Sequence, residues 1–483
     1  MAPTLLWYDL ETFGTHTRWD RIGQFAAIRT DYHFQEIGEP CSMYCRLSTD
    51  YVPDPDSCLL TGITPRIANE RGVSEAELSA TVYREMSTPN TCTLGFNTIR
   101  FDDEFIRNLF YRTFYDPYRR EYDHGNSRWD ILDLARMTRD LRPEGIKWPS
   151  DESGKPVFRL EELAAANGIE HDKAHDALSD VRATIRIASL IHEKQPKLFA
   201  YLFRFRKKDE VRRRLNLQAP RPLLHTSGMF TSPLGCTTVV YPLSVHPENP
   251  NAIITYDLRY DPTELTTLDA AEIRRRVFTR ADALDEERIH FKAIHLNRSP
   301  AIAPLDTLSE ERAVQLGIDL AQCRRNAELL RDRPSLVQKV RSAYDAAGSR
   351  QKVERDPELQ IYSGGFFGDE DRATFALVHS LEPSALAASP PQFADPRGAE
   401  LLRRYLARNY YELIAPAEQE RWLSWCASRL LAPELDTVLD YGRFRRKIEN
   451  LLARTDTSPY DKTILRDLLD YADVLDATVL QRR

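Results

Sequence analysis

The stretch LLWYDLETFG, residues 5–14, decides how the N-terminal part of this chain is interpreted. Its apolar and aromatic start predicts a buried strand, and Phe13-Gly14 marks the turn that follows. Asp9 and Glu11 are two residues apart, so on a strand their side chains point to the same face. Neighbouring carboxylates repel each other and are costly to bury. The pair therefore indicates either a strand end that faces water or a functional site.

Outward from this strand, residues 1–195 alternate strands with helices. Further strands are predicted at 24–29 (QFAAIR), 42–47 (SMYCRL) and 91–97 (TCTLGFN). Apolar stripes and glycine stops predict helices at 101–110, 159–168 and 175–191. Strands followed by helices are typical of an α/β domain with a central mixed sheet.

The rest of the chain changes character twice. Short β-like runs at 237–241, 252–256 and 291–296 predict a small β-rich domain, with helices at its edges, over residues 196–345. Residues 346–372 are polar and carry glycines, which predicts a linker. Apolar helical stripes over residues 373–483 predict a C-terminal α-helical domain.

Composition excludes several classes of protein. No run of about 18 apolar residues occurs, so a membrane span is excluded, and the N-terminus lacks the basic start of a signal peptide. We therefore expect a cytoplasmic protein. The seven cysteines are scattered and predict free thiols rather than a zinc site. The net charge of −7 means that any basic nucleic-acid footprint is local, for example at 204–214, 274–276 or 443–447. Each of these runs alone also fits a solvated helix face.

Two more acidic elements follow in the sequence. Asp102 and Asp103 open a helix directly after the buried strand at 91–97, where a lone aspartate is often a helix cap, and either residue could take either role. His175 and Asp180 stand at the start of the helix at 175–191, where a histidine is commonly structural. Considered together, these acidic residues and His175 suggest a metal-dependent site, which no single element suggests alone.

Two metal ions about 4 Å apart need several bridging oxygen ligands. Asp9, Glu11, Asp102 and Asp180 would supply four carboxylates, and His175 would supply a base that is neutral near pH 7. Such a set suits phosphodiester hydrolysis, in which one metal activates water and the other stabilises the leaving 3′-oxygen. The expected cofactor is Mg²⁺, two ions per site, with Mn²⁺ able to substitute.

The order Asp-x-Glu, Asp, His-x-x-x-x-Asp resembles the DEDDh exonucleases, and the longer strings resemble the bacterial exodeoxyribonuclease I family. The strings that carry the resemblance include YDLETFGTH, QFAAIRTD, LLTGITP, FDDEFIRN, FYRTFYDPY, NSRWDILDL, LRPEGIKWP, NGIEHDKAHDALSDVRATI and YLFRFRKK. Later in the chain SGMF, HPENPNA, YSGGFF, DEDR and YLARNY also match. The likeness spans nearly the whole chain.

The resemblance implies a ribonuclease H-like exonuclease domain, an SH3-like domain and a C-terminal helical domain, arranged as a C around one strand. It implies that Asp9, Glu11, Asp102 and Asp180 are metal ligands, with Asp102 preferred over Asp103, and that His175 is the general base. The implied activity is 3′→5′ removal of 5′-mononucleotides from single-stranded DNA in repair and recombination. A C-shaped monomer needs no second copy.

Aromatic platforms and basic grooves hold single strands. Phe13, Trp129, Phe366 and Phe367 are candidates for this contact, although core packing is the alternative for each. The family also binds the acidic C-terminal tail of single-strand DNA-binding protein. The resemblance suggests that Arg142, Tyr201 and Arg221 line the pocket for that tail.

Three alternatives remain open at this point. An exonuclease that acts on RNA would use the same chemistry, but a minimal enzyme of that kind would end near residue 195. A non-catalytic DNA-binding scaffold would be favoured by loss of one site residue, and all five are present. A proofreading subunit is the third alternative, and the sequence shows no feature that suggests a polymerase contact.

Overall fold

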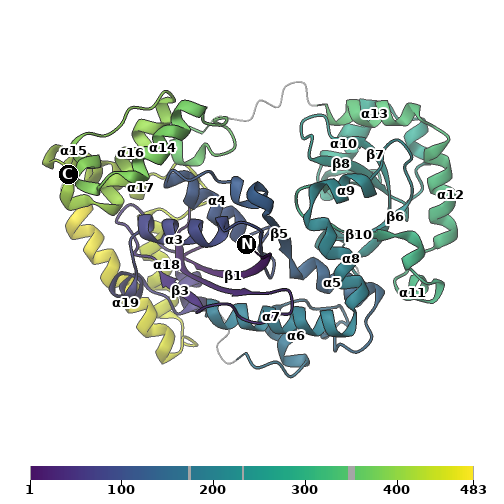
Figure 1. The fold of residues 1–483 in the computed structure, drawn as a ribbon, viewed down its shortest axis with the longest axis horizontal. Coiled ribbons are helices and arrows are strands. Elements are labelled where there is room, and N and C mark those ends of the chain that lie inside the picture. The colour runs from purple at the N-terminus through teal and green to yellow at the C-terminus, as the bar shows by residue number, and fades with distance from the viewer. Residues whose placement is uncertain (1, 172–175, 231–232, 346–353, 482–483) are drawn as a thin grey trace.

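A computed structural model of the chain describes residues 2–171, 176–230, 233–345 and 354–481 (Figure 1). An N-terminal domain lies in the middle of the molecule, a β domain lies on one side and a helical domain on the other. The predicted α/β domain with a mixed sheet, followed by β-rich and helical domains, is confirmed. Within the described residues no helix is long and apolar enough to cross a membrane.

The N-terminal domain is built on a mixed sheet in the order β3-β2-β1-β4-β5, with β1, β2 and β3 antiparallel and β4 and β5 parallel to β1. Its strands are β1 (Thr4–Thr12), β2 (Ile22–Thr30), β3 (Cys41–Tyr44), β4 (Thr91–Gly95) and β5 (Ser127–Asp130). Its helices are α1 (Pro55–Thr61), α2 (Pro65–Arg71), α3 (Glu75–Ser87), α4 (Asp102–Arg112), α5 (Ile131–Leu141), α6 (Leu160–Ala166), α7 (Ala177–Lys194), α8 (Pro196–Phe203) and α9 (Lys208–Arg214).

The β domain is an antiparallel sheet in the order β10-β6-β7-β8-β9, flanked by helices. Its strands are β6 (Leu223–Thr226), β7 (Thr237–Val245), β8 (Ala252–Asp257), β9 (Phe291–His295) and β10 (Ala301–Pro304). Its helices are α10 (Ala270–Phe278), α11 (Glu310–Gln315), α12 (Leu320–Arg331) and α13 (Ser335–Tyr344). The sequence predicted β7, β8 and β9, whereas the four-residue strands β6 and β10 are too short to show alternation.

The C-terminal domain is helical, as predicted. It contains α14 (Asp369–Ser380), α15 (Pro383–Ala388), α16 (Pro396–Asn409), α17 (Pro416–Leu431), α18 (Tyr441–Ala453) and α19 (Pro459–Leu475). Proline occupies the first turn of α15, α16, α17 and α19, where its missing N–H costs nothing. The predicted stripes of α16 and α19 are largely buried, so these helices are held by their apolar faces.

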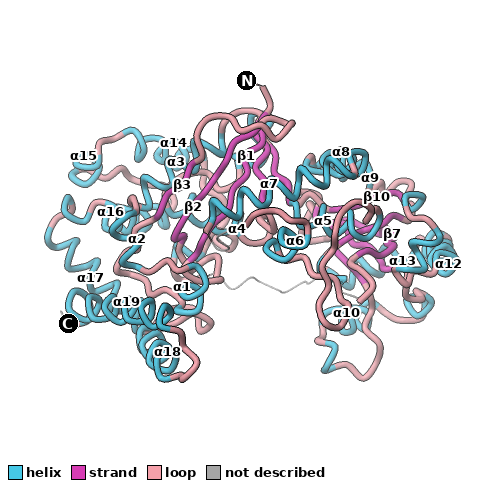
Figure 2. The backbone as a smooth tube through the Cα atoms, turned by 90° about the horizontal axis from the view of Figure 1, so that it is seen from below, coloured by secondary structure: helices cyan, strands magenta, loops and turns pink. Residues whose placement is uncertain are grey.

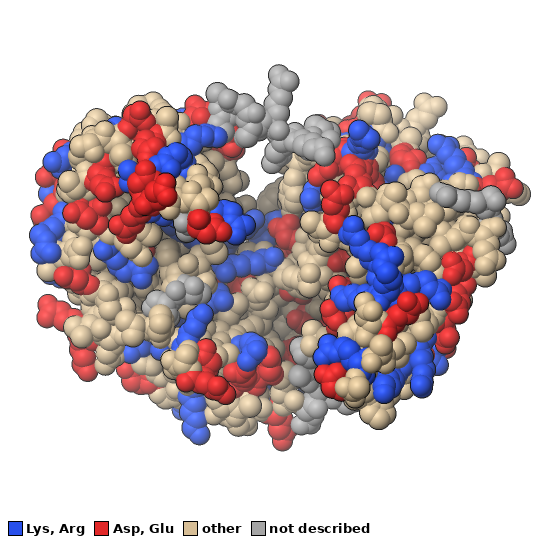
Figure 3. Space-filling model, turned by 180° about the vertical axis from the view of Figure 1, so that it is seen from behind, with Lys and Arg blue, Asp and Glu red and all other residues tan. Residues whose placement is uncertain are grey.

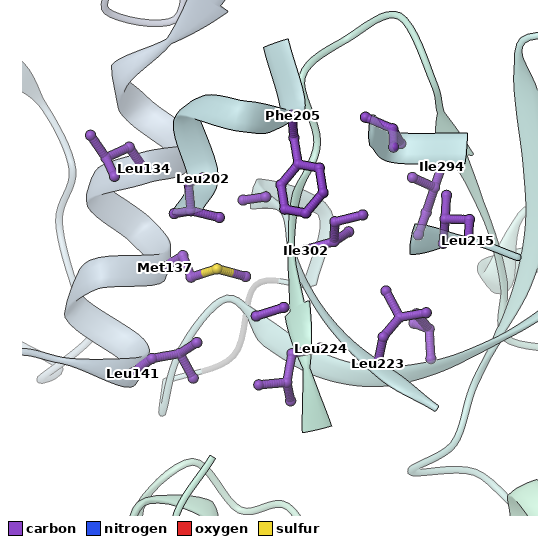
Figure 4. Close-up of a cluster of buried hydrophobic side chains, with 14 of the residues drawn as sticks. Leu134, Met137, Leu141, Leu202, Phe205, Leu215, Leu223, Leu224, Ile294 and Ile302 are labelled. Carbon is purple, nitrogen blue, oxygen red and sulfur yellow. The ribbon is translucent and has the colours of Figure 1, made fainter. Parts of the chain in front are cut away.

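One hydrophobic core continues from the N-terminal domain into the β domain (Figure 4). Leu134, Met137 and Leu141 of α5 face Leu224 of β6 and Ile302 of β10 across this core. All of them are almost fully buried, and burying one such side chain is worth about 1.5–3 kcal/mol. The two domains therefore pack as one body rather than as units joined by a flexible tether.

A second core joins the N-terminal domain to the C-terminal helices. Phe13 belongs to it, and its backbone oxygen accepts a hydrogen bond of 3.0 Å from the Tyr51 hydroxyl. The backbone oxygen of Tyr51 in turn accepts a hydrogen bond of 2.9 Å from the hydroxyl of Tyr471 in α19. The turn after β1 is thus tied to α19 of the C-terminal domain.

The described part of the predicted linker is packed rather than extended. Glu358 and Leu359 are buried, and the Glu358 carboxylate pairs with Arg408 of α16 and with Arg21 of the N-terminal domain. The local composition does not show this packing, because the ionic partners of Glu354, Asp356 and Glu358 come from distant parts of the chain.

The β domain and the helical domain flank a hollow. The space-filling view from behind shows the molecule recessed between the two lobes, with Lys and Arg side chains at the edge of the recess (Figure 3). The view from below shows α7 crossing the sheet of the N-terminal domain, where it contacts β1 and β2 (Figure 2). The acidic residues singled out in the sequence belong to these central elements.

Candidate active site

Asp9 and Glu11 lie near the end of β1, the central strand of the sheet. The parallel ladder between β1 and β4 runs as far as Trp7. Asp9 and Glu11 lie beyond it, opposite residues of β2, and the register shifts directly after Glu11. Their spacing places both side chains on one face, as predicted, at a point where β4 has turned away.

The turn after β4 brings a helix start against β1. A Cβ atom on Gly95 would lie 2.5 Å from the backbone oxygen of Tyr8 and 2.4 Å from the side chain of Thr98, so only glycine fits there. Asn97 adopts a left-handed backbone with φ of 68°, which asparagine tolerates better than most residues. This tight turn places Asp102 in the first turn of α4, next to the site carboxylates.

Asp180 comes from the first turn of α7. The Asp176 side chain caps this helix by accepting a hydrogen bond of 3.2 Å from the Ser179 backbone N–H. Asp9, Glu11 and Asp180 each offer a carboxylate oxygen, and these atoms all lie within 4.8 Å of one another. The structure therefore brings three of the four predicted metal ligands into one cluster.

Asp102 and Asp103 have different surroundings. The Asp103 carboxylate is neutralised by Arg120 at 2.5 Å and Arg128 at 2.7 Å, and it accepts a hydrogen bond from Tyr8. Asp102 is 4% exposed and acts electrostatically on Asp9 and Glu11. The helix cap is Phe101, so neither aspartate fills the capping position that was the alternative explanation.

Burial and neighbouring carboxylates raise the pKa of Asp9, Glu11 and Asp102. Desolvation is the largest cause for Asp9, followed by the charges of Asp102, Glu11 and Asp180. Desolvation followed by Asp180 and Asp102 raises the pKa of Glu11 to about 8. Desolvation also raises the pKa of Asp102 well above its ordinary range, against a backbone hydrogen bond from Leu10 that lowers it. In the absence of cations the Glu11 carboxyl is therefore mostly protonated at neutral pH.

The donor set fits divalent metal ions that prefer oxygen. The candidate ligands are all carboxylates, and the charges that most affect Asp9 and Glu11 are other carboxylates. Bound cations would relieve this repulsion, and hard cations such as Mg²⁺ and Mn²⁺ take this kind of ligand. Asp9, Glu11 and Asp180 would hold them, with Asp102 beside the cluster.

His175, the predicted general base, lies outside the described residues. His171 is a further residue of this site that was not predicted, and its Nε2 lies 2.5 Å from a carboxylate oxygen of Asp180. Its place in the string NGIEHDKAHD, four residues before His175, is the sequence signal that could have marked it.

The predicted DNA-stacking residues differ in exposure. Phe13 and Trp129 are 1% and 3% exposed, and Trp129 packs edge-on against Phe199 and Phe203. Phe367 is also buried, whereas Phe366 is 80% exposed. Burial argues against base stacking by Phe13, Trp129 and Phe367, because a base needs an open ring face. Phe366 retains one.

Phe366 belongs to an aromatic group that sequence reasoning missed. The rings of Phe366 and Tyr118 lie 5.9 Å apart, and the Arg107 guanidinium lies 5.2 Å from the Tyr118 ring centre. The hydroxyl of the half-exposed Tyr362 donates a hydrogen bond to the Glu104 carboxylate on α4. The strings YSGGFF and FYDPY carried this signal, but only the fold places them together.

The three predicted partner-binding residues lie on neighbouring elements. Arg142 ends α5, Tyr201 lies on α8, and the exposed Arg221 shortly precedes β6. Helix α5 contacts both α8 and β6. Burial raises the pKa of Tyr201 while Arg214 and Arg204 act to lower it, which places two further cations near this ring.

Family models match almost the whole chain. The model described as Exonuclease matches residues 6–188, the Exonuclease I SH3-like domain matches residues 206–346, and the Exonuclease I C-terminal domain matches residues 355–475. Exodeoxyribonuclease I of Escherichia coli K12 is 45% identical over 421 residues, which cover 87% of this chain and 88% of that protein.

Solved structures agree with these matches. E. coli exonuclease I in complex with a dA16 oligonucleotide superposes with a TM-score of 0.93 and 42% identity, covering 98% of this chain and 100% of that one. A zinc-bound form of an E. coli ExoI–ssDNA complex gives a TM-score of 0.91 at 42% identity, with the same coverage. An ExoI/SSB-Ct complex gives 0.90 at 41% identity, again covering 98% of this chain and 100% of that one.

Proposed function

This chain belongs to the exonuclease I family, and from that premise we propose that it removes 5′-mononucleotides from the 3′ end of single-stranded DNA. The observation that carries the proposal is the carboxylate cluster of Asp9, Glu11 and Asp180 within 4.8 Å, with Asp102 beside it. A buried set of mutually repelling acids is costly, and phosphodiester hydrolysis with two divalent metals gives it a use.

Each site residue has a role in this proposal. Bound Mg²⁺ or Mn²⁺ would supply Lewis-acid chemistry by activating water and stabilising the leaving 3′-oxygen. Asp9, Glu11, Asp102 and Asp180 would hold the ions with their carboxylate oxygens. His175 takes the proton of the attacking water, because an imidazole is neutral and basic near pH 7.

The hollow between the two lobes is an argument for a single-stranded substrate. It leads over the N-terminal domain and its edge carries Lys and Arg side chains (Figure 3). Phe366 and the half-exposed Tyr362 offer ring surface beside Arg107 on α4. Aromatic platforms combined with cations bind single strands with little sequence preference. The E. coli relative has been solved with a single-stranded oligonucleotide in place.

A partner and a cellular setting follow from the same family. The ExoI/SSB-Ct complex supports binding of the acidic tail of single-strand DNA-binding protein, with Arg142, Tyr201 and Arg221 as its contacts here. We place the protein in the cytoplasm, acting as a monomer in DNA repair and recombination.

A gel assay tests the proposed activity. Matched 5′-labelled oligonucleotides, as single-stranded DNA, blunt duplex and single-stranded RNA, are incubated with Mg²⁺ or with EDTA. The wild type is expected to shorten the DNA single strand stepwise, while EDTA, His175→Ala and Asp180→Asn stop the reaction. Glu77→Gln, an exposed acid on α3, serves as the charge-matched control and retains activity. Shortening of RNA alone, or an intact DNA strand with the wild type, contradicts the proposal.

A further inference from the structure

Behind the carboxylate cluster lies a second, buried group of charges centred on Asp103. One carboxylate oxygen of Asp103 accepts hydrogen bonds from the Tyr8 hydroxyl at 2.6 Å and from Arg120 at 2.5 Å. The other accepts one from Arg128 at 2.7 Å. The Arg120 side chain is fully buried, and those of Arg128 and Asp103 are 4% and 1% exposed.

These charges hold the two segments that carry predicted ligands. Tyr8 precedes Asp9 on β1, and Asp103 follows Asp102 at the start of α4. Neighbouring strand residues point to opposite faces, so the Tyr8 ring lies on the face away from Asp9. The bond between Tyr8 and Asp103 therefore joins β1 to α4 from behind the site and sets the spacing of the ligands in front.

The same group reaches the SH3-like domain through Arg128. The Arg128 Nη2 donates a hydrogen bond of 2.9 Å to the backbone oxygen of Asn297. The Arg128 backbone oxygen accepts a hydrogen bond of 2.8 Å from the Ser299 hydroxyl. Ser299 is buried and has a left-handed backbone with φ of 45°, which is unfavourable for serine. A strained backbone persists only where its surroundings hold it firmly, and Arg128 contacts this loop at both ends.

Stability alone is a weak reason to keep such a group. Replacing buried ion pairs by apolar side chains of similar size is often neutral or stabilising. Partners that orient metal ligands, in contrast, typically change metal affinity or activity about 10–100-fold when mutated. The contacts of Arg128 with Asp103 and with the loop at 297–299 are of this orienting kind.

We propose that Arg128 is a positioning residue, which fixes the Asp102 end of α4 relative to β1 and holds the SH3-like domain in register with the metal site. The inference rests on the proposed function, since the site it serves is the proposed metal site. Arg128 is not one of the candidate metal ligands and acts through Asp103. The SH3-like domain thereby contributes to the geometry of the ligands as well as to the shape of the hollow.

The test compares Arg128→Lys with a matched control, Arg112→Lys. Arg112 lies at the C-terminal end of α4, is as buried as Arg128 and pairs with Glu75 at 2.7 Å. The readouts are Mn²⁺ affinity without DNA by calorimetry, half-saturating Mg²⁺, kcat and KM on single-stranded DNA, DNA affinity in EDTA, and melting temperature.

Arg128→Lys is expected to weaken Mn²⁺ affinity and to lower kcat, each about 10-fold, while DNA affinity in EDTA stays within about 2-fold. Arg112→Lys is expected to lower the melting temperature and to leave Mn²⁺ affinity unchanged. Equal Mn²⁺ affinities for the two variants, whatever their melting temperatures, would overturn the proposal.

Two milder substitutions keep the test decisive if Arg128→Lys does not fold. Tyr8→Phe removes one hydroxyl from Asp103 and is expected to shift Mn²⁺ affinity in the same direction by about 3-fold. Ser299→Ala removes the contact from the SH3-like domain, and unchanged Mn²⁺ affinity in this variant would refute the link between the domains. Mn²⁺ binding is measured without DNA, so a wild type that binds Mn²⁺ but spares DNA would count against the proposed function and not against this inference.

Discussion

Replacing Glu11 by glutamine should stabilise the metal-free protein while abolishing its activity. Burial and the charges of Asp180 and Asp102 raise the pKa of the Glu11 carboxyl from 4.5 to about 8. Between these two values the folded state binds more protons than the unfolded state, so wild-type stability falls as pH rises. Glutamine does not titrate, so the stability of Glu11→Gln does not fall with pH in this way.

The pKa of Glu11 sets the size of the effect. At pH 7.5 the unfolded carboxyl is ionised and the folded one is mostly protonated, which costs the wild type at most about 4 kcal/mol. At pH 5 the same difference is about 1 kcal/mol. The advantage of Glu11→Gln in EDTA should therefore grow by up to about 3 kcal/mol between these pH values.

Urea unfolding followed by tryptophan fluorescence, in EDTA at pH 5 and pH 7.5, measures this difference. Saturating Mg²⁺ should reverse the order, because the wild type gains binding free energy that the variant has lost. Glu77→Gln, which changes an exposed acid on α3, controls for the altered net charge. A stability difference between Glu11→Gln and wild type that does not vary with pH would refute the argument that the site acids repel one another.

Three further outcomes are expected. Mg²⁺ should raise the melting temperature of the wild type, and the rise should shrink in Asp180→Ala, as thermal unfolding with and without EDTA will show. Phe366→Ala should raise KM on single-stranded DNA with an unchanged melting temperature, whereas Phe367→Ala, which empties a buried site, should lower the melting temperature by the equivalent of about 3–5 kcal/mol. Arg408→Met should destabilise the protein by about 3–5 kcal/mol, because it leaves Asp50 with one strong partner fewer in a buried network. Arg408, Arg21 and Arg429 hold the pKa of Asp50 below its ordinary range. The contribution of these ion pairs to the free energy of unfolding should therefore be lost as the pH falls below about 4, which urea unfolding measures.

Local sequence was sufficient for the features that depend on spacing. Asp9 and Glu11 had to share a face once β1 was recognised, and the apolar stripes placed α4, α7 and the C-terminal helices. The sheet order and the short strands β6 and β10 depend on pairing between distant residues, which no local pattern contains. The family resemblance, which the comparisons confirm, supplied the remaining architecture.

Residue spacing alone does not decide which of Asp102 and Asp103 is the candidate ligand. The two residues are adjacent and both begin α4, yet Asp103 is neutralised by Arg120 and Arg128, which come from a later loop and from β5. The exposure of aromatic residues could not be predicted for the same reason. Trp129 lies in a polar stretch of sequence, but its ring is covered by the rings of Phe199 and Phe203 in α8. Burial of a side chain is decided by its partners in space.

The contact of Tyr51 with Tyr471 has a consequence for biosynthesis. These residues are 420 positions apart, which at about 5–20 residues per second corresponds to roughly 20–80 s on the ribosome. Tyr51 supports the turn that follows Glu11, and it obtains its own support from α19, which is translated much later. A nascent chain therefore carries all the candidate site carboxylates long before the turn behind them is supported, and the full geometry of the candidate site forms only after α19 has been synthesised.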